Sequence, residues 1–196
     1  MIAMRMTRAA KLLILASAMA PAAATAQDWK AYPYPSPGFA VQFPAPPSVE
    51  QDTFKTAAGQ ALPLTRYVLR QDGIVFSVEV IDFSGAQPNS LATIAEAEKS
   101  FGMNGKVTVA IDARINREFG RELSVTGDDG SRSTVAIFFV SQHLVELVAK
   151  ALTPNPLAKS ADAIQFQQSL QFIGPNELLG GLNHYSGRGG PGVGGR

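Results

Sequence analysis

The chain has 196 residues, no cysteine, and 17 Lys and Arg against 16 Asp and Glu. The lack of cysteine excludes disulfides, thiol catalysis and Cys-ligated zinc or iron–sulfur centres, so the fold must be held by its apolar core. The charge is nearly balanced and forms no basic stripe, which argues against binding to nucleic acid or, by charge, to anionic lipid.

Residues 1–26 are predicted to be a signal peptide. Three basic residues precede an apolar run over 12–20, and residues 24–26 read Ala-Thr-Ala, an A-x-A cleavage site. The apolar run is shorter than the roughly 20 residues that a membrane span needs. We therefore expect cleavage after Ala26, a periplasmic or secreted location and no stable membrane insertion; the alternative is an uncleaved N-terminal anchor. The processed chain would carry a net charge of −2.

Residues 27–37 are an aromatic and proline-rich lead-in. Trp29, Tyr32 and Tyr34 are expected in an extended arm packed on the domain, because X-Pro pairs favour extended chain and large aromatic side chains bury much area. Contact of this arm with a partner is the alternative. Residues 38–43 precede a proline-rich stretch, so they are expected to form a short strand at an edge or at a strand end.

The next segments predict a hairpin. Residues 48–56 are a polar strand candidate, and residues 62–70 and 74–83 are two apolar strands joined at Asp72-Gly73. This dipeptide is typical of the two-residue turns that match the twist of paired strands.

One helix is predicted before the middle of the chain. Asn89 or Ser90 can cap it, and Gly102 is expected to end it. Its apolar stripe is expected to comprise Leu91, Ile94, Ala95 and Phe101. Residues 106–115 then alternate in the manner of a strand. One side of that strand is expected to carry Val107, Val109 and Ile111.

Residues 120–150 are the most apolar part of the chain outside the N-terminus and predict three consecutive antiparallel strands. The first, 120–126, has one polar face, and Gly127-Asp128-Asp129-Gly130 supplies the chemistry of a turn. Residues 133–140 are β-branched and aromatic on both faces, as is typical of a central strand covered on both sides. Layers are therefore expected on both faces of the sheet.

A second helix is expected to begin at Ser160. Phe166 and Leu170 lie at i,i+4 with Ile164 nearby, and Gly174-Pro175 is expected to end the helix.

Together these elements predict one domain over residues 38–175. It is an α+β domain in which an antiparallel β-sheet of about seven to eight strands is covered by helices, and a monomer is expected. The glycine-rich residues 176–196 are predicted to be a flexible tail, because they cannot bury enough apolar area to offset their ordering entropy.

Three segments carry a resemblance to a known family. They are Gly38-Phe39-x-Val41-x-Phe43-Pro44, the Gly120-Arg121-Glu122 strand, and Phe166-x-x-Ser169-Leu170-x-Phe172. On these segments the chain resembles the PsbP-like family, named after an extrinsic subunit of photosystem II and also present as exported bacterial proteins of poorly defined role. The resemblance implies an α/β/α sandwich, with a central antiparallel sheet between helices. No catalytic or metal-binding residue of the family carries over, and the lipid-anchor cysteine of many bacterial relatives is missing.

The sequence offers no constellation typical of catalysis. His143 and His184 lack the further ligands of a metal site and an orienting acid, and there is no G-x-S-x-G motif. The adjacent carboxylates Asp128 and Asp129 are assigned to their turn. We therefore predict no catalytic residue, no cofactor and no metal.

A cluster of arginines is the candidate binding surface. Arg114, Arg117 and Arg121 lie around a strand junction, and guanidinium groups suit carboxylates or other anions. Glu118 and Glu122 alternate with them, so a self-paired surface is the alternative interpretation.

These observations predict a soluble exported accessory or binding protein of the bacterial envelope that is not an enzyme. Its partner would be an envelope protein or a small ligand. The alternative function is a small-ligand carrier or hydrolase with a pocket between the sheet and a helix. A third hypothesis is an envelope protein tethered through residues 183–196.

Overall fold

The computed structural model describes residues 28–34, 36, 38–152 and 160–173. The expected signal peptide, residues 153–159 and the glycine-rich tail therefore lie outside the described residues. In chain order the elements are β1 Lys30–Tyr34, β2 Phe39–Phe43, β3 Ser48–Lys55, β4 Ala61–Gln71, β5 Ile74–Asp82, α1 Ser90–Met103, β6 Lys106–Ile115, β7 Glu118–Thr126, β8 Arg132–Val140, β9 His143–Ala151, α2 Ser160–Gln168 and β10 Gln171–Phe172.

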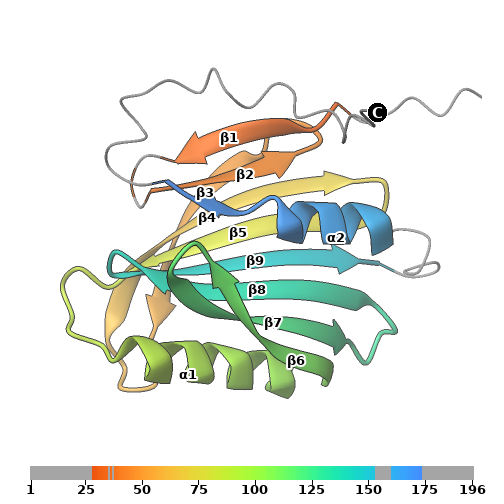
Figure 1. Cartoon of the computed structure of the whole chain (residues 1–196). Coiled ribbons are helices and arrows are strands. Elements are labelled where there is room, and N and C mark those ends of the chain that lie inside the picture. Colours follow the sequence, from red (N-terminus) through yellow and green to blue (C-terminus); the bar gives the residue numbers. More distant parts are fainter. Residues whose placement is uncertain (1–27, 35, 37, 153–159, 174–196) are drawn as a thin grey trace, which may run out of the picture.

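Seven strands form one antiparallel sheet in the order β3-β4-β5-β9-β8-β7-β6 (Figure 1). The predicted hairpin is present as β4 and β5, and its turn residues Asp72 and Gly73 have φ values of 51° and 76°. Gly130, which closes the turn before β8, also has a positive φ of 77°. Such angles are open mainly to glycine, aspartate and asparagine, so these residues determine where the chain reverses.

The strand predicted to be covered on both faces is β8, and the prediction is confirmed. α1 packs on one face of the sheet, over β6, β7 and β8, while α2 packs on the other face, over β8 and β9. Val135 and Ile137 point into the core beneath α1, whereas Ala136 and Phe138 point into the core beneath α2. The described residues thus form an α+β fold with an antiparallel sheet between two layers.

A second, smaller sheet completes the layer that contains α2. It has the order β1-β2-β10, so the prediction of a single sheet is wrong, and of the two places expected for residues 38–43, an edge or a strand end, the edge is wrong because β2 is the central strand of a separate sheet. The prolines after Phe43 end the strand and let the chain change layers. The prediction that the aromatic arm packs on the domain is confirmed. The ring centres of Trp29 and Phe76 lie 5.6 Å apart, and those of Tyr32 and Phe43 lie 5.8 Å apart.

α1 is present, but two details of its prediction are wrong. Asn89 caps it, accepting a hydrogen bond from the Ala92 N–H at 3.0 Å, yet the helix continues through Gly102 to Met103. Leu91 is 59% exposed and does not belong to the apolar stripe. The buried residues are Ile94 and Ala97, with Phe101 partly buried beside them, while Ala95 is exposed.

β6 departs from strict alternation through a bulge between Val107 and Val109. Val107 therefore faces the core beneath α1, whereas Val109 and Ile111 face the other side, so the prediction that all three share one face is wrong. The extra residue, Thr108, bonds to the Ser124 carbonyl at 3.1 Å. A bulge of this kind reverses the facing of all residues beyond it.

α2 ends earlier than predicted. It stops at Gln168, and residues 171–172 form β10 rather than a further helical turn before Gly174. Phe166 and Leu170 are buried as expected, whereas the nearby Ile164 is 44% exposed.

Candidate functional site

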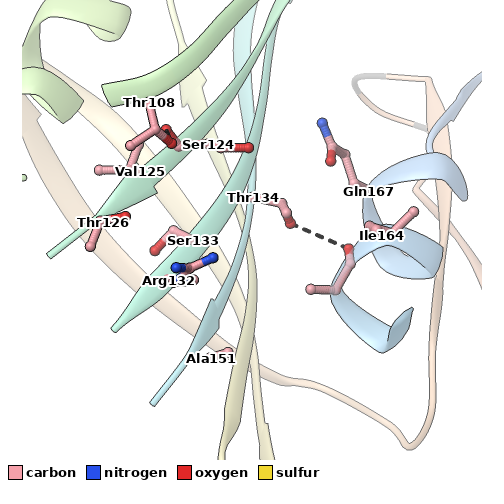
Figure 2. Close-up of a pocket in the computed structure, with 11 residues that line it drawn as sticks. Thr108, Ser124, Val125, Thr126, Arg132, Ser133, Thr134, Ala151, Ile164 and Gln167 are labelled. Atoms are coloured by element: carbon pink, nitrogen blue, oxygen red, sulfur yellow. Dashed lines mark hydrogen bonds between the residues drawn. The ribbon is translucent and has the colours of Figure 1, made fainter. Parts of the chain in front are cut away.

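A cavity of about 270 Å³ lies between α2 and the sheet (Figure 2). It opens beside the helix, over the part of β6, β7 and β8 that α2 does not cover. The lining residues are Thr108, Ser124, Val125, Thr126, Arg132, Ser133, Thr134, Ala151, Ala163, Ile164 and Gln167. Most of them carry hydroxyl or small alkyl groups.

The alternation of β7 and β8 places the polar side chains on this face. Leu123 and Val125 belong to the core beneath α1, so Ser124 and Thr126 face the opposite side, toward α2. Thr134 of β8 lies directly opposite Ser124. This is the polar face that the sequence of 120–126 predicts, and the structure makes it the wall of a cavity instead of a freely solvated surface.

Two side-chain hydrogen bonds hold the edge of α2 against β8. The Thr134 hydroxyl donates to the Ala163 carbonyl at 3.3 Å (Figure 2), and the Gln167 amide donates to the Val135 carbonyl at 3.2 Å. Phe166 anchors the same helix from its buried side, between the rings of Phe43 and Phe76. The helix therefore forms a fixed wall of the cavity.

The cavity wall has one charged side chain, Arg132. It lies at the start of β8, opposite Thr126 of β7 and Ala151 of β9, and it is exposed at the cavity mouth. Arg132 forms no ion pair with another residue in the described part of the chain. The nearest carboxylate on the same face of β7 is Glu122, two residues from Ser124 and outside the cavity lining.

Exposed apolar side chains border the cavity. Val109 and Ile111 of β6 are 47% and 51% exposed, and Val109 lies opposite Ser124. Ile164 of α2 projects from the helix side. β6 is an edge strand of the main sheet, so this border is also the margin of the sheet. A second, more open hollow at α2 shares Ile164 with the cavity and is lined largely by glutamines.

The three arginines predicted as a binding surface do not line this cavity. Arg121 lies on the α1 face, where its guanidinium bonds to Glu98 at 2.9 and 3.1 Å and also to Asp112. These carboxylates raise the pKa of Arg121, mainly through its hydrogen bond to Glu98. Arg114 rests over the Phe119 ring at 5.9 Å, and Arg117 is exposed in the β6–β7 connection.

The residues considered for metal or acid–base chemistry are in other places. The His143 Nδ1 lies 2.7 Å from the Ser141 carbonyl oxygen, and its Nε2 lies 3.8 Å from the Asp82 carboxylate. Asp129 accepts bonds from the Ser131 hydroxyl and N–H, which lower its pKa, so its turn role is confirmed. His184 lies outside the described residues. Within the described ranges, no three His, Cys, Asp or Glu side chains gather closely enough to hold a metal ion.

Arg132, Ser124 and Thr126 line the cavity but were not among the site residues predicted from the sequence. The available signal was the polar alternation on 122–126 together with an arginine just across the turn, but sequence alone did not show that a helix edge would enclose them.

Comparisons with known proteins add no assignment, because no family model and no curated protein matches the chain. The resemblance to the PsbP-like family therefore stays a prediction. Neither helix in the part of the chain that the structure describes has the length and apolar character to cross a membrane.

Proposed function

We propose that the chain is an exported, non-catalytic binding protein of the bacterial envelope that holds a small ligand in the cavity beside α2. The observation that carries the proposal is the cavity itself, about 270 Å³ in volume, with a wall of hydroxyl and alkyl groups and one charged side chain. Such a mixture of apolar surface with a few convergent polar groups is typical of ligand sites.

The chemistry of the wall favours binding over reaction. Ser124 and Thr126 offer hydroxyls and Arg132 a guanidinium, all of which can orient a ligand, whereas the Thr134 hydroxyl and the Gln167 amide already donate to backbone carbonyls. The lining residues include no carboxylate or imidazole that would accept a proton from a neighbouring hydroxyl. Export rests on the basic start, apolar run and A-x-A site of residues 1–26.

The test fills the cavity. Ser124→Phe places a ring in it, whereas Ser77→Phe places the same ring on β5, on the opposite face of the sheet. The full chain and both variants are incubated with a small-molecule extract of the envelope, and retained compounds are identified by mass spectrometry. We expect one compound retained by the wild type and Ser77→Phe and lost in Ser124→Phe. Equal retention by Ser124→Phe would contradict the proposal, as would turnover of the compound.

A second candidate function, an assembly accessory for an envelope protein, is favoured by the exposed apolar residues on β6. Val109 and Ile111 lie on an edge strand, to which an extended segment of a partner can add by backbone pairing. Affinity capture from the envelope tests this function. The expected result is a reproducible protein partner that the double variant Val109→Lys/Ile111→Lys no longer captures; capture that is unchanged by this variant would exclude β6 as the docking strand.

A further inference from the structure

We infer that the ligand of the α2 cavity is a small molecule with a single anionic end, a carboxylate or phosphate, which Arg132 binds, and with a short alkyl body. This inference rests on the proposed binding function and names the chemical class of its ligand. It follows from the charge, the hydrogen-bonding groups and the size of the cavity.

Arg132 is the one lining residue with a charge. No carboxylate among the described residues forms an ion pair with it. Two guanidinium groups on internal strands are neutralised within the fold, Arg66 by Glu79 at 2.8 Å and Arg121 by Glu98 at 2.9 Å, and Arg70 of β4, which is unpaired among the described residues, lies outside the cavity lining. Arg132 has no such carboxylate. An arginine stays charged at every physiological pH, so Arg132 places a positive charge at the mouth of the cavity.

Hydroxyl groups beside Arg132 suit the same anion. Thr126 lies opposite Arg132 across the β7–β8 pair and faces the same side of the sheet, with Ser124 two residues away on that side. A guanidinium offers two parallel N–H donors to a carboxylate or phosphate, and a neighbouring hydroxyl can donate to a remaining oxygen. Neither hydroxyl forms a side-chain hydrogen bond to another described residue.

The rest of the cavity limits the ligand to one charged end. Ala151, Ala163 and Ile164 give the wall an apolar part, which fits an alkyl body. Glu122 faces the same side of β7 as Ser124 and lies two residues from it, which is about 7 Å along the strand at ~3.3 Å per residue. Its carboxylate would repel a second anionic group of the ligand. The cavity volume corresponds to about nine waters at ~30 Å³ each, which is room for a carboxylate or phosphate on a short alkyl chain.

The experiment titrates the ¹⁵N-labelled full chain with hexanoate and with hexyl phosphate, and compares hexanol and hexylammonium. We expect saturable shifts of the amide signals of Ser124, Thr126, Arg132 and Thr134 with one or both anions. The two anions distinguish a carboxylate from a phosphate ligand. Hexanol is expected to bind at least tenfold more weakly, and hexylammonium is expected to leave these signals in place.

The matched variants are Arg132→Gln and Arg70→Gln. Both residues are exposed arginines at the end of a strand without an ion pair to a described residue, but Arg70 lies on β4, outside the cavity lining. Arg132→Gln is expected to weaken anion binding about tenfold or more, with Arg132→Lys intermediate because it keeps the charge and loses the two-pronged geometry. Arg70→Gln is expected to bind as the wild type does.

The outcomes separate this inference from the function on which it rests. If hexanol shifts the cavity signals as strongly as hexanoate does, and Arg132→Gln changes nothing, the anionic class is wrong while the cavity remains a binding site. If the anions bind but shift residues elsewhere on the chain, the inference is also wrong. If none of the four probes shifts the cavity signals and no envelope compound is retained, both the inference and the proposed function fail.

Discussion

Glu79 of β5 and Glu146 of β9 lie directly opposite each other on the same face of the sheet, the face that carries α1. Arg66, the next residue in this cross-strand row, bonds to Glu79 at 2.8 Å. The Glu146 side chain has no hydrogen bond or ion pair with another described residue. Burial and the neighbouring charge of Glu79 raise the pKa of Glu146 to about 7.

This raised pKa makes the stability of the fold fall as the pH rises. An unfolded glutamate loses its proton near pH 4.5, whereas Glu146 in the folded chain keeps its proton until about pH 7. Between these values the folded state binds more protons than the unfolded state, so the free energy of unfolding decreases with pH across that window. Hydrogen bonds from Ser84 and Ser131 lower the pKa values of Asp82 and Asp129. Below that window, protonation of these two carboxylates therefore makes the free energy of unfolding decrease as the pH falls.

Glu146→Gln tests the first of these effects. The neutral amide removes the ionised form, so we expect the variant to be more stable than the wild type at pH 8, by about 1–2 kcal/mol once partial exposure to water is allowed for. At pH 4.5 the gain should vanish. Urea unfolding at both pH values measures the difference. Glu122→Gln is the control, because Glu122 faces Ile111 and Ala136 on its neighbouring strands; an equal gain in that variant would contradict the prediction.

The second prediction concerns Arg121, which connects α1 to the sheet. Its guanidinium bonds to Glu98 of the helix through two nitrogens and to Asp112 of β6. A double-mutant cycle between Arg121→Ala and Glu98→Ala is expected to give a coupling free energy of about 0.5–1.5 kcal/mol, above the usual range of exposed pairs because the contact is bidentate and partly buried.

Arg114 and Arg117 serve as controls for that cycle. Both side chains are exposed, and neither forms an ion pair with a described residue. Cycles of Arg114→Ala or Arg117→Ala with Glu98→Ala are expected to give coupling free energies near zero. A coupling of Arg117 to Glu98 as large as that of Arg121 would show that long-range charge, rather than the direct contact, determines the value.

Local sequence chemistry predicted the elements that depend on neighbours in the chain. The turn at Asp72-Gly73 needs positive φ angles, and the chain supplies residues that adopt them. The run over 133–140 is apolar on both faces, and β8 is indeed covered twice. α1 and its cap at Asn89 follow from the same kind of local pattern.

Features that depend on distant contacts were not predictable in this way. The period of α1 allows a stripe through Leu91 or one through Ala97, and only packing against β7 and β8 selects Ala97. The bulge at Thr108 arises from its pairing with β7, which the sequence of β6 alone does not reveal. The cavity was missed for the same reason, because Arg132 and Ser124 become a site only when the edge of α2 lies over them.

The third prediction concerns two glycines on which the same substitution has opposite effects. In Gly120→Ala the new methyl group would overlap the Ile137 carbonyl oxygen and the Phe138 ring, which lies across from it on β8. We expect a loss of about 1–3 kcal/mol or more, as for an overpacked core. In Gly102→Ala the methyl group lies 3.8 Å from the Val107 side chain, an ordinary contact. The free energy of unfolding is expected to increase by about 0.5–1 kcal/mol, because alanine favours the helix more than glycine does. Denaturant unfolding of both variants measures the change in the free energy of unfolding, which is expected to have opposite signs.

The final prediction compares two positions on α2 that the sequence pattern does not separate. Phe166 is fully buried, with ring centres 5.0 Å from Phe43 and 5.1 Å from Phe76, so it connects α2 to both sheets. Phe166→Ala is expected to lower the free energy of unfolding by about 3–5 kcal/mol, because it removes buried ring area and leaves a void between the packed layers.

Ile164, two residues earlier, is 44% exposed at the cavity border, so Ile164→Ala should change the free energy of unfolding by less than about 1 kcal/mol. Thermal and urea unfolding of the two variants give the comparison. Similar losses in both would mean that α2 is seated with its cavity side inward, and that result would also remove the wall on which the proposed ligand site depends.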